Sequence, residues 1–455
     1  MKNKLLLLAS AFAITFGQLT MVSCGNNDSP SSSESKEDEK DNEKDNEKDE
    51  GEGSGLTPLE QKQYLEKTGL ELVNHLQAEE IQNLSDIGVY FMEHYVYSRQ
   101  YDTDALDDHI TDVVKNLTTS IGDERSGHYL YHLYKVIYSA TAFNGHYNAG
   151  ATGWEYTPAE DLRITFKGNA NKDYIVKIST SGEAGTVYIT DYKYNYGYYQ
   201  DEAYRDYIYL TLPKHAEVTF TENGKTLVNI LLNASISGLI NDKVDLASSR
   251  VDVNGTINFN NYEIQIDKAT VQSGNESEIK MQMNHVGEML ISSQIKATAT
   301  IHGNHTMIDK DTDIADWENQ SAKSISVSLN ILNKVQLRGS LKDAVKLAMK
   351  LEKANANYTN ELDFKAYIND ANDLMDIGIY YDNENEHQAS VKLMAFSEKS
   401  PYSGRVYWEA VPVVSFADGS TYSIEVFFDE SDFRDLIHAA EALVDDYERE
   451  ASKLD

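Results

Sequence analysis

The sequence predicts an α+β protein, with an N-terminal helical segment packed on a large curved antiparallel β-meander and further helices near and at the C-terminus. Three observations lead to this fold class. Apolar residues recur at three- and four-residue steps before position 150, at alternate positions over 151–340, and in both patterns over 341–455. Sustained alternation is typical of antiparallel strands with one buried and one solvated face. A run of helices followed by a run of strands indicates α+β architecture.

The helical segment is expected over residues 56–150. It opens with Thr57-Pro58-Leu59-Glu60, which has an N-cap residue, a proline in the first turn and a glutamate placed to complete a capping box. Helical spacing of apolar residues returns over 83–97, 104–119 and 127–143. We therefore expect several helices before the period changes.

The β-meander is expected over residues 151–340. Leu162, Ile164 and Phe166 alternate with polar residues, and later segments repeat the pattern. Asn223-Gly224 separates two alternating runs, and Asn-Gly accepts the positive φ angles of a two-residue hairpin turn. A meander of this length with one apolar face must curl around packed helices, its own far edge or a ligand.

Residues 341–455 are expected to mix helices and strands and to close the same domain or a second one. Helical periodicity marks 341–354, 359–374 and 429–453. Asp418-Gly419 predicts another hairpin turn, between strands at 411–413 and 422–424.

The first residues predict a secretory signal peptide over 1–23. Lys2 and Lys4 precede an apolar run at 5–16, which is shorter than the ~20 residues that cross a bilayer. Met21-Val22-Ser23-Cys24 resembles the lipobox of bacterial lipoproteins, in which the cysteine receives diacylglycerol. The resemblance implies cleavage before Cys24 and attachment to a membrane through lipid on that residue. Cys24 is the only cysteine, so an intramolecular disulfide is excluded.

Residues 24–55 are expected to form the lipidated cysteine and a disordered acidic tether. The tether has twelve Asp and Glu residues against four lysines and has no aliphatic or aromatic residue, so it cannot offset its ordering entropy by burial. An acidic run after a lipidated cysteine resembles the export signal of surface lipoproteins of the Bacteroidota. This implies an outer-membrane protein that faces the cell exterior. The alternative is a plain spacer in the periplasm.

The body of the chain, with its LTPLEQKQYLE start and long meander, resembles an uncharacterised group of Bacteroidota surface lipoproteins, which implies no activity. The expected fold also resembles, by analogy of shape, that of lipoprotein carriers of the outer-membrane localisation type. In those proteins a curved sheet and covering helices enclose an acyl-chain cavity. This analogy implies a carrier function.

Charge and motif content exclude several function classes. The formal net charge of −34 repels phosphate backbones, so nucleic acid is not expected as a partner. His128 and His132 have zinc-ligand spacing, but the glutamate of the metalloprotease motif is missing, and packed aromatic-belt histidines are the simpler interpretation. We predict no catalytic residue, and a hydrolase without a recognisable motif remains the enzyme alternative.

A tyrosine-rich insertion is the best candidate for ligand binding. Tyrosine rings stack on sugars and peptides while their hydroxyls stay hydrated. The predicted patch comprises Tyr194, Tyr196, Tyr198 and Tyr199. The alternative is the outward face of an ordinary twisted hairpin.

A calcium site is a weaker prediction. Asp309, Asp311 and Asp313 have the spacing of hard oxygen ligands that Ca²⁺ prefers. Ile314 and Gln320 stand where an EF-hand needs glycine and glutamate, so a complete EF-hand is excluded. A looser calcium site or a plain acidic loop remains.

Three functions are therefore open. The first is a non-enzymatic binding or adhesion module for a glycan or protein, the second a carrier of an apolar ligand in the concave face of the sheet, and the third a hydrolase. The residues expected to line the carrier cavity are Ile257, Phe259, Ile264, Met281 and Met283.

Overall fold

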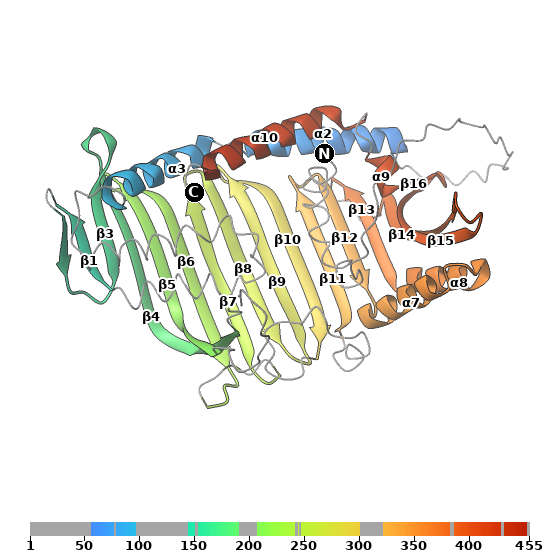
Figure 1. Ribbon diagram of the computed structural model, residues 1–455, viewed down its shortest axis with the longest axis horizontal. Helices are drawn as coiled ribbons and strands as arrows, with labels where there is room; N and C mark the ends of the chain where they lie inside the picture. Colours follow the sequence, from blue (N-terminus) through green and yellow to red (C-terminus); the bar gives the residue numbers. More distant parts are fainter. Residues whose placement is uncertain are drawn as a thin grey trace.

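The computed structural model describes residues 56–76, 79–96, 144–150, 153–190, 207–241, 244, 247–300, 322–382, 386–428 and 432–452. Within them the predicted α+β fold is confirmed, since helices flank a single 16-stranded sheet (Figure 1). The strands are β1 (Gly145–Ala149), β2 (Trp154–Thr157), β3 (Leu162–Lys167), β4 (Asp173–Thr190), β5 (Tyr207–Glu222), β6 (Lys225–Ser237), β7 (Arg250–Phe259), β8 (Tyr262–Gln272), β9 (Glu276–His285), β10 (Glu288–Ala299), β11 (Ala322–Ile331), β12 (Val335–Leu341), β13 (Met375–Tyr381), β14 (Ala389–Lys399), β15 (Val406–Phe416) and β16 (Thr421–Ser423).

The sheet follows the chain almost strictly. From β3 to β16 each strand pairs antiparallel with the next, as a meander requires. The exception is β1, which lies between β2 and β3 and pairs parallel with β3. The helical segment expected to reach position 150 therefore ends earlier than predicted. Alternate burial explains the difference, because Gly145 and Tyr147 are buried while His146 and Asn148 are half-buried.

Tight turns fix the register between strands. Asn223 and Gly224 have φ angles of 47° and 81° and join β5 to β6, which confirms the predicted hairpin. Gly419, with φ 83°, lies in the predicted turn between β15 and β16. β16 ends sooner than expected, because the Ser423 hydroxyl caps the short helix α9 (Ile424–Phe427) by accepting from the backbone N–H of Val426.

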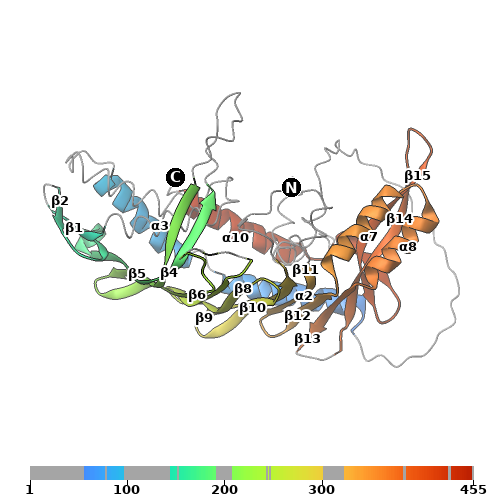
Figure 2. The same cartoon turned by 90° about the horizontal axis from the view of Figure 1, so that it is seen from below.

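Helices cover one face of the sheet near one end of its strands. α2 (Pro58–His75), α3 (Glu79–Phe91) and α10 (Arg434–Ser452) lie in a row across those ends (Figure 1). A short π-helix, η1 (Met92–Val96), continues α3. Seen along the strands, the sheet is a shallow trough with α3 and α10 on its concave side (Figure 2).

The predicted capping box at the start of α2 is present. The Thr57 hydroxyl accepts from the backbone N–H of Glu60, and the Glu60 carboxylate accepts from the backbone N–H of Thr57 at 2.8 Å. Farther along α2, the buried Gln61 amide accepts from the Tyr381 hydroxyl of β13 at 3.0 Å and donates to the carbonyl of Gln388. These contacts fasten α2 to the sheet.

Two apolar cores hold the helices on the concave face. The first packs Ile87 and Phe91 of α3 and Tyr95 of η1 on β1 to β4, for example with Phe91 and Phe166 ring centroids 4.6 Å apart. The second packs α2, α9 and α10 on β11 to β15, with Phe427 fully buried. Each core lies toward one end of the long sheet.

Two more helices lie toward the opposite end of the strands (Figure 1). α7 (Ala344–Ala356) and α8 (Glu361–Asn372) confirm the two helices predicted between residues 341 and 374. Their buried Phe364 and Ile368 pack against β14 and β15. β13 and β14 share only two register pairs, at Gly378 and Ile379, so the sheet opens here and α8 packs against β14.

Asn372, at the end of α8, takes the place of a neighbouring strand beside β14. Its side-chain amide donates to the Leu393 carbonyl at 2.8 Å and accepts from the Leu393 N–H at 2.8 Å.

Replacing Asn372 with alanine leaves both backbone groups of Leu393 unpaired. We expect Asn372→Ala to reduce the free energy of unfolding by about 1–3 kcal/mol, measured by urea denaturation.

Asn372→Asp is a second test of the same contact. It keeps the acceptor for the Leu393 N–H but sets a carboxylate against the Leu393 carbonyl. We expect it to be destabilised as well, through repulsion at that carbonyl. Wild-type stability in both variants would contradict the strand-like role of Asn372.

Candidate functional site

The central strands carry an apolar surface on the concave side, between the two cores. Register pairing aligns its side chains in rows across β6 to β10: Ile230 with Ile257, Ile257 with Ile264, Ile264 with Met283. We call this surface the concave floor. It comprises Ile230, Leu232, Val253, Ile257, Ile264, Ile266, Ile279, Met281, Met283 and Ile295.

The floor is incompletely covered. All its side chains are half-buried or exposed, although the strands lie in the middle of the sheet. Ile279 is 41% exposed and Met281 is 39% exposed. Large contiguous apolar patches are uncommon on soluble proteins and mark binding surfaces. The floor is therefore the main candidate site in the described part of the chain.

Four of the five residues expected to line a carrier cavity lie on the floor, and the fifth, Phe259, lies on the same face near the helices. Phe259 stacks on Tyr262, with ring centroids 5.0 Å apart. Strand alternation alone was enough to place these side chains together, because residues two apart on a strand share a face. The exposure of Ile279 and Met281 describes an open surface there.

The end of α2 bounds the floor above β8 and β9. The Tyr262 hydroxyl donates to the carbonyl of His75 at 2.6 Å, and the Tyr262 ring stacks on His285 with centroids 4.5 Å apart. The Nδ1 atoms of His75 and His285 lie 3.5 Å apart. These contacts fasten the C-terminal end of α2 to β8 and β9.

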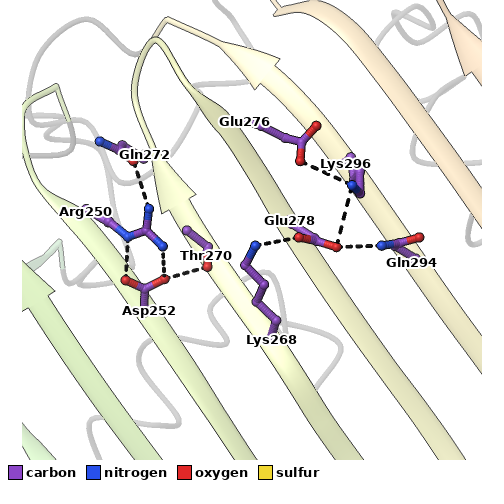
Figure 3. Close-up of polar contacts among 9 residues, drawn as sticks. All are labelled: Arg250, Asp252, Lys268, Thr270, Gln272, Glu276, Glu278, Gln294 and Lys296. Carbon is purple, nitrogen blue, oxygen red and sulfur yellow. Dashed lines mark hydrogen bonds and ion pairs between the residues drawn. The ribbon is translucent and has the colours of Figure 1, made fainter.

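Over β7 to β10 the convex face is polar and carries two ionised carboxylates that are paired with basic side chains (Figure 3). Asp252 accepts two hydrogen bonds from Arg250, at 2.6 and 2.8 Å, and one from Thr270 at 2.6 Å. The hydrogen bonds from Arg250 are the main reason that the pKa of Asp252 is lowered. The two-point geometry fits the planar guanidinium fork.

Glu278 is the second of these carboxylates. Although it points to the convex face, it is only 8% exposed. It accepts from Lys268 at 2.6 Å and from Gln294 at 2.5 Å, and Lys296 lies 4.0 Å away. The hydrogen bond from Lys268, followed by that from Gln294, lowers the pKa of Glu278. A carboxylate held ionised in this way is a poor general acid at neutral pH, so the network is structural.

Comparison with models of protein families, with curated proteins and with solved structures gives no match. Among the described residues, no three His, Cys, Asp or Glu side chains are grouped to hold a metal ion. No helix in the described ranges is long and apolar enough to cross a membrane.

Several predicted sites lie outside the described residues: Cys24 with its lipid, the tether, the tyrosine patch (Tyr194, Tyr196, Tyr198, Tyr199) and the calcium candidates Asp309, Asp311 and Asp313. The predicted helices over 104–119 and 127–143 lie outside them too. Sequence reasoning missed the convex networks. The Arg250-x-Asp252 spacing was a readable signal, whereas the partners of Glu278 depend on strand register.

The lowered pKa of Glu278 predicts an acid-sensitive contribution to stability. Because the folded-state pKa lies below the unfolded value of about 4.3, ionised Glu278 stabilises the fold above that value. The contribution is lost as the pH falls through the folded-state pKa. We expect Glu278→Gln to melt below the wild type at pH 7, with the difference shrinking toward pH 3.

Glu276→Gln is the control, since Glu276 has a half-exposed side chain and its Lys296 contact is 3.3 Å. An exposed ion pair of this kind contributes little. Melting curves across the same pH range should leave Glu276→Gln close to the wild type. A pH-independent loss in Glu278→Gln would show that its charge is not what stabilises the sheet.

Proposed function

We propose that this chain is a lipid-anchored, non-enzymatic binding protein of the outer membrane that faces the cell exterior and holds an apolar ligand on the concave floor. The observation that supports the ligand is the exposure of Ile279 and Met281 in the middle of the sheet. The expected lipidation at Cys24 and the acidic tether support the location. A protein carried on such a tether could meet ligands while remaining attached.

An extended alkyl chain suits the floor chemically. Its residues are aliphatic or methionine side chains in parallel rows, and methionine adapts its shape to apolar partners. Each CH₂ group removed from water contributes about 0.8 kcal/mol, so one-sided contact with an open surface gives roughly half as much. Several CH₂ groups in contact are then needed to offset the cost of association.

The contrast between the two faces supports the choice of face. Residues that neighbour the floor along the same strands, such as Gln265 and Gln282, point to the convex side and bond to each other at 2.9 Å. An apolar ligand gains nothing there. Binding of a glycan or protein through Tyr194, Tyr196, Tyr198 and Tyr199, and binding of Ca²⁺ by Asp309, Asp311 and Asp313, stay predictions from the sequence.

A charge on the floor should weaken binding. Met281→Glu places a carboxylate among floor side chains at an already exposed position, so the fold should tolerate it. Binding is measured with a fluorescent long-chain fatty acid and the chain of residues 25–455. We expect the dissociation constant of Met281→Glu to be at least ten times that of the wild type, a loss of about 1.4 kcal/mol of binding free energy.

Gln282→Glu is the matched control, because it adds the same group to the next residue of β9 on the opposite face. The Gln265 amide can turn to donate to it. This variant should bind as the wild type does. Equal loss in both variants, or a wild type that does not bind the fatty acid, would reject the floor as a site for an apolar ligand.

The anchor has its own test. Because the lipid is expected on a single thiol, Cys24→Ser should move the protein from the membrane fraction to the soluble fraction without changing its melting temperature. Immunoblotting after a carbonate wash measures the distribution. A Cys24→Ser protein that still sediments with membranes would mean that something other than lipid holds it.

A further inference from the structure

Three basic side chains stand side by side on the convex face at the N-terminal end of the sheet. His146 of β1 is in register with Arg163 of β3, and Arg163 is directly opposite Lys177 of β4. We call these residues the basic row. It ends in a threonine on each side, Thr157 of β2 and Thr219 of β5.

One carboxylate serves the two outer members of the row. Asp161 accepts from His146 Nε2 at 2.9 Å through Oδ1 and contacts Lys177 Nζ at 3.3 Å through Oδ2. The hydrogen bond from His146 is the main reason that the pKa of Asp161 is lowered. Both of its oxygens are therefore engaged, and it remains ionised.

Arg163, in the centre, has no such partner. Among the described residues its guanidinium makes no hydrogen bond and no ion pair, and its Nε is buried. The hydroxyl of Thr165, two residues along the same face of β3, is also buried without a hydrogen-bond partner. Buried polar groups almost always have partners, so two unpartnered groups side by side need an explanation.

The charges add to the anomaly. Like charges directly opposite each other on paired strands are destabilising, as Arg163 and Lys177 are. Arg163 and Lys177 are positive and Asp161 is negative, so the three groups together have a formal charge of +1. This occurs in a chain of net charge −34, where carboxylates are abundant.

We propose that the basic row is a binding site for an anionic group of a ligand: a carboxylate, sulfate or phosphate. The Arg163 guanidinium is the two-point donor that such planar or tetrahedral oxyanions fit, and Lys177 adds a positive charge beside it. The site lies on the face opposite the concave floor, so it does not depend on the function proposed for the floor.

Anion-dependent melting of the full chain, solubilised in a non-ionic detergent, tests the proposal. Melting temperatures are measured at pH 7 in sodium acetate, sulfate or phosphate, each against sodium chloride at equal ionic strength. At about ten times the dissociation constant, a bound anion should raise the melting temperature of the wild type by about 1–3 °C. The arm with the largest increase identifies the preferred oxyanion.

Arg163→Gln should lose that increase, and Arg163→Lys should lose most of it because the fork is gone. Arg405→Gln is the matched control, since Arg405 is exposed between β14 and β15 and its hydrogen bonds with Ser403 and Ser400 are made by its backbone N–H and carbonyl. It should keep the increase. If all the variants show the same increase in melting temperature, the increase comes from the general stabilising effect of excluded salts, and the proposed site is rejected.

A second measurement guards against a variant that does not fold. In low-salt chloride, Arg163→Gln should melt at or above the wild type, because it removes a like-charge contact. An anion-specific increase that persists in Arg163→Gln, or a wild type without one, would overturn the proposal. A large loss of stability in low-salt chloride would do so too, since it would make Arg163 a structural residue.

Discussion

Cross-strand pairing between neighbours in the chain is the interaction on which the rest of this structure depends. From β3 to β16 every strand pairs with the next, so short local turns such as Asn223-Gly224 set the register of the sheet step by step. Since side chains alternate along each strand, this register makes one face apolar and the other polar over the central strands β7 to β10. A slip of one residue would exchange the two faces.

The helices then divide the apolar face. They lie in a row at one end of the strands and form two cores, one with β1 to β4 and one with β11 to β15. Single polar contacts fasten them, such as Gln61 with Tyr381 and Tyr262 with the carbonyl of His75. The sheet is wider than either core, so the described helices leave the concave floor half-covered.

Charged side chains on the convex face are paired differently over the central strands and at the N-terminal end of the sheet. Over β7 to β10, Asp252 accepts from Arg250 and the Thr270 hydroxyl, and Glu278 accepts from Lys268 and the Gln294 amide, so each carboxylate is balanced by a basic side chain. Over β1 to β4, one carboxylate serves two of the three members of the basic row and Arg163 is left over. Matched charges stabilise a surface, whereas an unmatched arginine with fixed neighbours is suited to an external anion.

The sequence by itself determined the fold class, most strand positions, both predicted hairpin turns and the helices between residues 341 and 374, because hydrophobic period and turn chemistry act over a few residues. It also placed the carrier candidates on one face, since alternation is local. Only the tertiary structure decided which parts of that face are covered, because coverage depends on where distant helices dock. It likewise decided that Arg163 lies between His146 and Lys177. The parallel pairing of β1 with β3, which no local pattern encodes, brings those three side chains into one row.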